Sequence, residues 1–215
     1  MSSAFETYHA RLAAGERAET IALTALAEAR AAPDCFVTLL SEEAVRASAR
    51  AVEARLAADV DLPLAAVPFC VKDNLDVAGL VTSCNCPGFG ALATATAPAI
   101  DNAIAAGAIL IGKNTMDQFA TGLNGTRAPE LLCQNALNPK IIPGGLSSGS
   151  AVAVARGLCG FALDSDTGGS GRVPAAANGI VGLKPTPGLI SGRGMVHCNR
   201  SFDVIKPLPC RARRL

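Results

Sequence analysis

The chain contains no tryptophan and a single tyrosine, and aromatic residues make up only 4% of its 215 residues. Half of the residues are hydrophobic, so the core has to be built mainly from Ala, Val, Leu and Ile. No apolar run approaches the ~18 residues that a membrane-spanning helix requires, and no membrane association is expected. The length indicates one domain that can bury a core of useful size.

An excess of charge of either sign is also missing. Nineteen basic residues face 18 acidic ones, and no basic stripe occurs before Arg211, Arg213 and Arg214. A nucleic-acid partner is therefore not expected, because such surfaces carry clustered Lys and Arg. The first twenty residues carry charges throughout and lack the apolar segment of a secretory signal, which predicts a cytoplasmic protein.

Metal-binding patterns are absent from the sequence as well. The two histidines, His9 and His197, lie near opposite ends, and of the eight cysteines only Cys84 and Cys86 are close together. This spacing does not match a zinc site, which needs grouped ligands. We interpret the cysteines as small buried hydrophobic residues in a reducing compartment, and we expect no metal and no cofactor.

Short apolar runs alternate with Ala-rich segments. Helices are predicted at residues 17–32, from Ser41 onward, at 97–107 and at 149–157, and strands at 66–71, 108–112, 161–163 and 180–183. The runs are continuously apolar, which is typical of strands buried on both faces. We therefore predict an α/β fold with a mixed, mostly parallel sheet that helices cover on both faces.

Two Gly-rich segments are candidates for a functional site. Residues 143–150 read Pro-Gly-Gly-Leu-Ser-Ser-Gly-Ser, and residues 166–172 read Asp-Thr-Gly-Gly-Ser-Gly-Arg. A Gly-Gly-Ser turn can direct consecutive backbone N–H groups toward one point beside a hydroxyl, the geometry of a nucleophile with an oxyanion hole. Neither segment ends in Gly-Lys-Ser/Thr, so neither is a phosphate-binding loop. Each segment alone is equally typical of a flexible loop.

A serine nucleophile requires a base. Because histidine is scarce, a lysine is the alternative, provided that burial or a neighbouring cation favours its neutral form. Lys72 and Lys113 each end an apolar strand, and their positions alone do not separate them. Anchoring at the surface is the other interpretation of either lysine.

Taken together, these segments resemble the amidase-signature family in their order and spacing. The resemblance runs from about residue 17 to 205, and its motifs are residues 68–74, 144–155 and 166–175. Residues 109–113, 117–122 and 125–127 are similar to the allophanate hydrolase branch of that family. The resemblance implies the amidase-signature fold and hydrolysis of the C–N bond of a small-molecule amide with release of ammonia, as in urea degradation. Self-association into a homodimer stays open.

Carried over residue by residue, the resemblance assigns Lys72 as the lysine of a Ser-Ser-Lys triad and Ser170 as the nucleophile. It places the oxyanion hole at the backbone N–H groups of Thr167, Gly168, Gly169 and Ser170. It also implies substrate contacts at Gly122 and Arg127. In the family's mechanism the lysine draws a proton from a bridging serine, which activates the nucleophile, and the acyl-enzyme is then hydrolysed.

The bridging serine of the family corresponds to position 146, which is Leu146 in this chain. Leucine can neither relay a proton nor accept a hydrogen bond from a lysine. We therefore expect reduced amide hydrolysis, with the next hydroxyl, Ser147, as the candidate substitute in the catalytic set. The alternative is a truncated amidase remnant without activity.

Other departures from the family pattern point the same way. Asp164-Ser165 stands where the family has Gly-Thr, and Glu130-Leu131 where allophanate hydrolases have Tyr-Gly; a buried Glu there would repel an anionic substrate. By this comparison the C-terminal half of the family domain is missing. The predicted organisation is a partial amidase domain over 1–215, with N-terminal helices at 1–60, the signature core at 61–205 and a divergent tail at 206–215.

A second class of hydrolase matches a shorter pattern. Residues 145–149 fit the Gly-x-Ser-x-Gly elbow of α/β-hydrolases, and Asp166 and His197 follow in the right chain order. That elbow should directly follow a strand, whereas residues 141–143 are short and end in proline. We therefore favour the amidase interpretation, whose mechanism needs no histidine.

Overall fold

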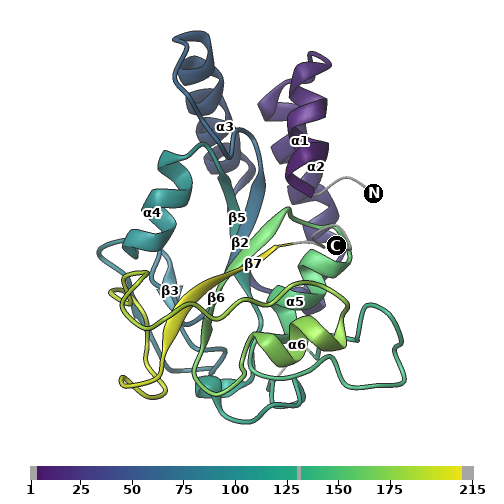
Figure 1. Cartoon of the computed structure of the whole chain (residues 1–215), viewed down its shortest axis with the longest axis vertical. Helices are drawn as coiled ribbons and strands as arrows, with labels where there is room; N and C mark the ends of the chain where they lie inside the picture. Colours follow the sequence, from purple (N-terminus) through teal and green to yellow (C-terminus); the bar gives the residue numbers. More distant parts are fainter. Residues whose placement is uncertain (1–3, 130–131, 210–215) are drawn as a thin grey trace.

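The computed structural model describes residues 4–129 and 132–209, and the predicted α/β fold with a mixed sheet is confirmed. The main sheet has the strand order β1-β5-β2-β6-β7 (Figure 1). Its strands are β1 (Phe36–Leu39), β5 (Ile109–Asn114), β2 (Pro68–Lys72), β6 (Phe161–Asp166) and β7 (Val204–Pro209). The central strands β5, β2 and β6 are parallel, whereas β1 and β7 pair antiparallel at the two edges.

Helices pack on both faces of this sheet. They are α1 (Ala4–Ala13), α2 (Ala18–Arg30), α3 (Glu42–Ala57), α4 (Pro98–Ala105), α5 (Ser148–Ala155) and α6 (Arg172–Ala177), with 3-10 turns η1 (Pro33–Cys35) and η2 (Gln118–Ala120) and a small hairpin of β3 (Val81–Thr82) and β4 (Ala91–Leu92). Phe69 and Val71 join one core cluster with α1 to α4, and Cys70 joins the other with α5. Successive residues of a strand point to opposite faces, so this division follows from the pleat.

Two helices show how local sequence sets the elements. The predicted cap of α3 is confirmed, because the Ser41 hydroxyl oxygen accepts a hydrogen bond from the Ala44 N–H at 3.1 Å. Every residue of α5 from Ser148 to Val154 is buried, as expected for an Ala- and Val-rich helix without a polar face. The Gly-rich segment before α5 is thus held against the sheet by a helix with no solvent-exposed side.

One predicted strand is absent from the structure, and one predicted boundary falls inside a strand. Residues 180–183 form no strand; they follow α6 as irregular chain, and Leu183 is 61% exposed, so no neighbouring strand holds them. Residues 206–209, assigned to a divergent tail, belong to β7, which pairs with the whole of β6. The remainder of that tail, 210–215, and the predicted Glu130-Leu131 departure lie outside the described residues. Within the described ranges, no helix has both the length and the apolar character needed to cross a bilayer.

Gly149 lets the start of α5 approach the end of β5, which yields a stability prediction. A Cβ at position 149 would lie 2.4 Å from the Thr115 hydroxyl oxygen and 2.7 Å from the Cys35 carbonyl oxygen. We expect Gly149→Ala to lower the free energy of unfolding by about 1–3 kcal/mol, the usual cost of overpacking. Urea denaturation measures it. Gly192→Ala is the control, because its Cβ would meet nothing closer than 3.4 Å, and equal stability of the two variants would contradict the prediction.

Candidate active site

Three charged residues lie side by side on adjacent strands at the centre of the candidate site. The β2–β6 register places Val71 opposite Leu163, so Lys72 and Asp164 follow as neighbours, and the β6–β7 register pairs Asp164 with Lys206. All three side chains are fully buried. We call Lys72, Asp164 and Lys206 the charged row. A carboxylate between two amines is a costly arrangement in a core, so its hydrogen bonds decide what the site can do.

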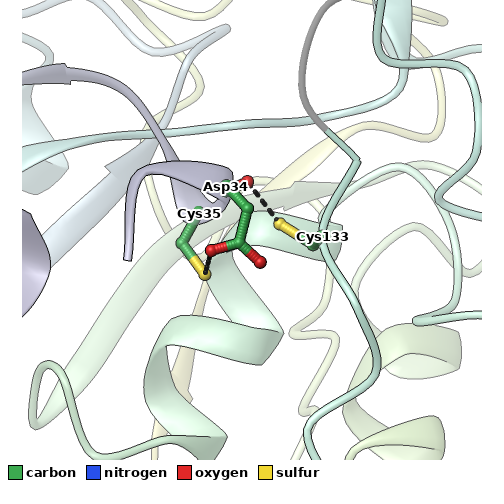
Figure 2. A group of neighbouring side chains, drawn as sticks. All are labelled: Asp34, Cys35 and Cys133. Atoms are coloured by element: carbon green, nitrogen blue, oxygen red, sulfur yellow. Dashed lines mark hydrogen bonds between the residues drawn. The ribbon is translucent and has the colours of Figure 1, made fainter. Parts of the chain in front are cut away.

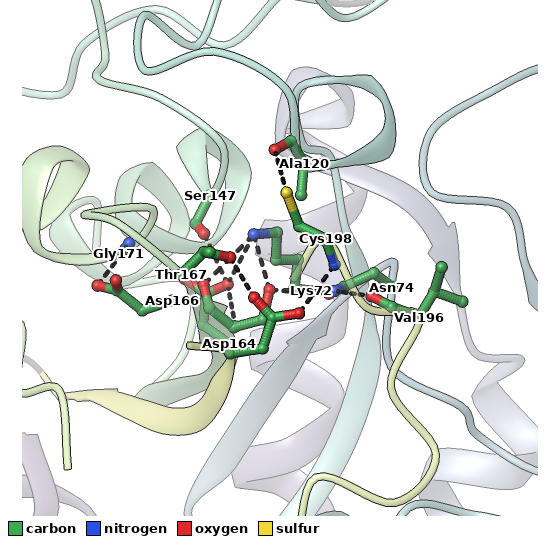
Figure 3. Close-up of polar contacts among 12 residues, drawn as sticks. Lys72, Asn74, Ala120, Ser147, Asp164, Asp166, Thr167, Gly171, Val196 and Cys198 are labelled. Atoms are coloured by element: carbon green, nitrogen blue, oxygen red, sulfur yellow. Dashed lines mark hydrogen bonds and ion pairs between the residues drawn. The ribbon is translucent and has the colours of Figure 1, made fainter. Parts of the chain in front are cut away.

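Lys72 is bound to β6. Its Nζ lies 3.5 Å from the Asp164 Oδ1 (Figure 3). The Nζ also donates to the Ser165 Oγ at 3.0 Å, and the Asn74 side-chain amide donates to the same Oγ at 3.0 Å. Lys113, which sequence position did not separate from Lys72, lies elsewhere: its Nζ pairs with Asp73 and donates to the Val81 carbonyl oxygen. Of the two candidate lysines, only Lys72 pairs with Asp164, whose carboxylate also binds Ser147 of the first Gly-rich segment.

Asp164 joins the two Gly-rich segments. The Ser147 hydroxyl donates to the Asp164 Oδ1 at 2.6 Å (Figure 3). The Ser165 N–H donates to the same oxygen at 2.7 Å. Ser147 is fully buried, so a substrate cannot reach its oxygen in this arrangement. The hydroxyl considered as a substitute relay is therefore already committed to a carboxylate.

Leu146 faces an apolar environment. Its side chain is 4% exposed and packs with Cys84, Met116 and Ala120 in a small hydrophobic cluster. Its φ of 37° lies in the left-handed region, which is uncommon for a residue with a Cβ. At the position where the resemblance predicted a bridging serine, this chain therefore has an apolar side chain in a hydrophobic cluster.

The loop of residues 166–172 is organised around the Asp166 carboxylate. This carboxylate accepts hydrogen bonds from the Gly169 N–H at 2.8 Å, from the Gly171 N–H at 3.2 Å and from the Arg172 guanidinium at 3.0 Å. Burial alone would raise the pKa of Asp166, but the hydrogen bonds from Arg172 and Gly171 and the charge of Arg172 outweigh it and lower the pKa to about 2. The loop is thus fixed by a carboxylate that stays ionised.

The hydroxyl of Ser170 sits within this loop. Ser170 is 1% exposed, and its Oγ has no hydrogen-bond partner among the described residues. Of the proposed oxyanion-hole amides, the Gly169 N–H is used by Asp166, whereas those of Thr167, Gly168 and Ser170 make no hydrogen bond to a described residue. The φ of 143° at Gly169 explains why a glycine is needed there. The loop offers a hydroxyl with three neighbouring donor groups.

Lys206 was missed by sequence reasoning because it fell in the segment read as a divergent tail. Its Nζ has no partner among the described residues, and burial lowers its pKa despite the opposing charges of Asp164 and Asp166. Gly171 makes room for it: a Cβ at that position would lie 1.9 Å from both the Cε and the Nζ of Lys206. The signal that could have found it is a lysine inside an otherwise apolar run, Val204 to Pro209.

The predicted substrate-contact residues lie together beside this site. Gly122 has a φ of 106° and lies next to the Arg127 side chain. A Cβ built at position 122 would lie 3.2 Å from the Arg127 Nε. Asp117 shapes their loop by accepting hydrogen bonds from the Arg127 N–H at 2.7 Å and the Gly125 N–H at 3.0 Å. Arg127 is exposed, so its guanidinium is available to an anionic group.

The hydrolase-elbow alternative does not assemble. The His197 Nδ1 lies 3.1 Å from the Asp203 Oδ2, and Asp166 is bound to Arg172 rather than to a histidine. The serine of that pattern, Ser147, donates to Asp164. Ser147, Asp166 and His197 therefore each bind a different residue, and none of the three binds another member of the set.

A separate group of side chains could offer ligands to a soft metal ion. Asp34, Cys35 and Cys133 each place one ligand atom within 4.8 Å of the others (Figure 2). The Arg156 guanidinium, however, lies 3.1 Å from both Asp34 carboxylate oxygens, and the hydrogen bond with Cys133 and burial raise the pKa of Cys35 well above its ordinary value. A bound cation requires a free carboxylate and thiolates. The arrangement favours a packed thiol cluster beside α5.

The sequence of the chain matches that of a known protein family. The sequence profile described as Amidase matches residues 20–213, beyond residue 205, where the sequence-based resemblance was expected to end. The chain is 42% identical over 204 residues to a component of the glutamyl-tRNA(Gln) amidotransferase of Lachnospira eligens, covering 93% of this chain and 42% of that protein. It is also 42% identical over 172 residues to urea amidolyase of Saccharomyces cerevisiae, covering 80% of this chain and 9% of that one.

Among solved structures, the allophanate hydrolase of Kluyveromyces lactis aligns with a TM-score of 0.78 at 40% identity, covering 82% of this chain and 29% of that one. The chain therefore spans less than half the length of each of these relatives. The two kinds of curated relative match at the same identity, so similarity alone does not choose between these branches.

The lowered pKa of Asp166 indicates that acid reduces the stability of the loop of residues 166–172. Because the pKa of Asp166 is lowered from 3.8 to about 2, its stabilising contribution is complete above pH 3.8 and is lost as the pH falls toward 2. We expect Asp166→Asn to lower the free energy of unfolding at neutral pH by about 1.5–3 kcal/mol, the usual worth of hydrogen bonds to a charged group. The variant should also lose part of the pH dependence between 4 and 2 in denaturant titrations. Asp59→Asn, at an exposed turn, is the control; a variant as stable as wild type would refute the role of Asp166.

Proposed function

Because the chain belongs to the amidase family, we propose that it hydrolyses the C–N bond of a small-molecule amide with Ser170 as the nucleophile. The observation that carries the proposal is the loop of residues 166–172. Its only buried hydroxyl without a described partner, Ser170, lies beside three unused N–H donors at the carboxyl end of β6. Preorganised donors of this kind stabilise the oxyanion of a tetrahedral intermediate, and each is worth about 10²–10³ in rate.

The proposed reaction follows from these groups. The Ser170 Oγ attacks the carbonyl carbon of the amide, and the developing oxyanion accepts hydrogen bonds from the N–H groups of Thr167, Gly168 and Ser170. Collapse of the intermediate breaks the C–N bond and releases ammonia, and water then hydrolyses the acyl-enzyme. The Gly169 N–H is omitted from the oxyanion hole because it donates to Asp166.

For the substrate we propose allophanate or a close linear amide. Similarity to the yeast urea amidolyase and to the K. lactis allophanate hydrolase supports this choice. The exposed Arg127 beside Gly122 supports it further, since a guanidinium suits a planar carboxylate. The equal identity to the amidotransferase component makes the substrate the part of the proposal that most needs a test.

The second candidate is an amidase-like protein without catalytic activity. It is favoured by Leu146, which has an apolar side chain at the position where the resemblance predicts the bridging serine. It is also favoured by Lys72, because the hydrogen bonds and the ion pair of its Nζ are made with Ser165 and Asp164 on β6. In this alternative the loop of Ser170 keeps its shape because Asp166 holds it, but no base reaches the hydroxyl.

A covalent probe identifies the nucleophile. A fluorophosphonate should label the protein, and Ser170→Ala should abolish labelling because the reactive oxygen is removed. Ser147→Ala should leave at least part of the labelling, since that hydroxyl is bound to Asp164 and buried. Mass spectrometry of the labelled peptide and ammonia release from allophanate and malonamide complete the test. Labelling that survives Ser170→Ala but is lost in Ser147→Ala would show that the assignment is wrong.

Restoring a hydroxyl at position 146 should raise activity. In the second candidate, where no base reaches Ser170, we expect Leu146→Ser to increase amide hydrolysis by about 10²–10⁴-fold, the usual worth of general acid–base catalysis, because Lys72 would regain a relay. Ammonia release measures the rate.

Two controls separate the relay from other effects of this change. Leu146→Ala empties the apolar cluster in a similar way but adds no hydroxyl, and Leu146→Ser with Lys72→Ala should return to the starting rate. If the serine and alanine variants gain equally, then the relay is not the cause.

A further inference from the structure

An unused amine lies next to the proposed nucleophile. Lys206 is fully buried, and its Nζ has no hydrogen-bond or ion-pair partner among the described residues. The volume that a side chain at position 171 would occupy is filled by the Cε and Nζ of Lys206. Position 171 directly follows Ser170, whose own Oγ also lacks a described partner. Two reactive groups without partners thus lie around the same backbone segment.

The charged row contains one carboxylate and two amines, so only one amine can be neutralised by it. The Asp164 Oδ1 lies 3.5 Å from the Lys72 Nζ and accepts hydrogen bonds from Ser147 and Ser165. The other oxygen, Oδ2, has no hydrogen bond to a described residue. A buried ammonium without a partner is strongly unfavourable, so burial favours the neutral form of Lys206 more than that of an exposed lysine.

The groups that face Lys206 from neighbouring elements support this division. Asp164 and Asp166 lie on β6, Lys72 lies on β2 and Arg172 lies on α6. The two carboxylates favour the charged form of Lys206, whereas burial and the two cations oppose it, and the net result is a lowered pKa. A neutral amine has a lone pair that can accept a proton.

We propose that Lys206 is the base that activates Ser170, with Asp164 as the partner of Lys206 once it is protonated. The proposal rests on the proposed function and supplies the proton acceptor that Leu146 leaves missing. The cross-strand pairing of Asp164 with Lys206 and the missing side chain at Gly171 place the amine beside the nucleophile's loop. Catalytic hydrogen bonds are often long without substrate and shorten when it binds.

The proton balance closes with these residues. The Ser170 O–H bond breaks as Oγ attacks the amide carbonyl carbon, and Lys206 gains the proton and becomes an ammonium beside the free Asp164 Oδ2. Lys206 then gives this proton to the leaving nitrogen as the C–N bond breaks. In the second half, Lys206 takes a proton from water as the hydroxide oxygen attacks the acyl carbon, and it returns that proton to the Ser170 oxygen.

Two variants test the amine in different ways. Lys206→Met removes the nitrogen but keeps the length of the side chain, and Gly171→Ala keeps the lysine but displaces its tip. Gly171 has φ −112° and ψ −30°, which alanine adopts without strain, so its Cβ acts mainly on Lys206. Lys140→Met, at an exposed position, is the matched control for loss of a lysine.

The readout is the rate of fluorophosphonate labelling of Ser170 as a function of pH, with folding checked by thermal melts. We expect both variants to lose at least about 10²-fold in rate, and the double variant to lose no more than either alone. The wild-type rate should rise with pH as Lys206 loses its proton, and this rise should vanish in Lys206→Met. A folded Lys206→Met whose rate stays within about threefold of wild type would overturn the proposal.

Leu146→Ser separates failure of this proposal from failure of the proposed function. If wild type is not labelled but Leu146→Ser is, then Ser170 is the nucleophile and Lys206 is not its base. If neither protein is labelled at Ser170, then the proposed function itself is wrong. If wild type is labelled and Gly171→Ala labels at the same rate, then the position of the Lys206 amine is irrelevant and the proposal also fails.

Discussion

The charged row of Lys72, Asp164 and Lys206 is the constraint on which the rest of the site depends. Each member comes from a different strand, and each is fully buried, so the desolvation cost has to be offset by contacts between strands. Asp164 provides these contacts, because its Oδ1 lies near the Lys72 amine and accepts hydrogen bonds from Ser147 and Ser165. One carboxylate therefore fixes β2, β6 and the segment before α5 relative to one another.

This carboxylate also explains how leucine is accommodated at position 146. The resemblance to the amidase-signature family implies a serine at that position through which the lysine would act, whereas here the Lys72 amine contacts Ser165 and Asp164 on β6. The neighbouring hydroxyl, Ser147, closes the same network from the other side. Because Lys72 and Ser147 find their polar partners on β6, position 146 needs no polar atom. An apolar side chain there can pack against Cys84 and Met116.

Much of the fold could be predicted because its signals are local. Continuous apolar runs predicted β2, β5 and β6, and Ser41 predicted the start of α3. The segment 180–183 was wrong because a run of four apolar residues does not show whether a neighbouring strand is available to pair with it. The two Gly-rich loops and Lys72 could be found from sequence, since they are contiguous motifs.

Lys206 could not be found in this way. Its meaning depends on the antiparallel pairing of β7 with β6, which brings it opposite Asp164, a residue far from it in the chain. The missing side chain at Gly171 is likewise informative only once Lys206 is seen to fill its place. Single residues acquire a role here through non-local contacts, and no spacing in the sequence reports those contacts.

Two different carboxylates hold the two halves of the candidate machinery. Asp166 accepts hydrogen bonds from Gly169, Gly171 and Arg172 and thereby shapes the loop that carries Ser170. Asp164 pairs with the Lys72 amine and accepts a hydrogen bond from Ser147 in the preceding Gly-rich segment. Because these sets share no hydrogen bond, a replacement at position 146 leaves the hydrogen bonds of the Asp166 loop in place. The proposed site can therefore differ from the family pattern at the relay and keep its proposed nucleophile and N–H donors, and the proposed base, Lys206, is the one further group that it requires.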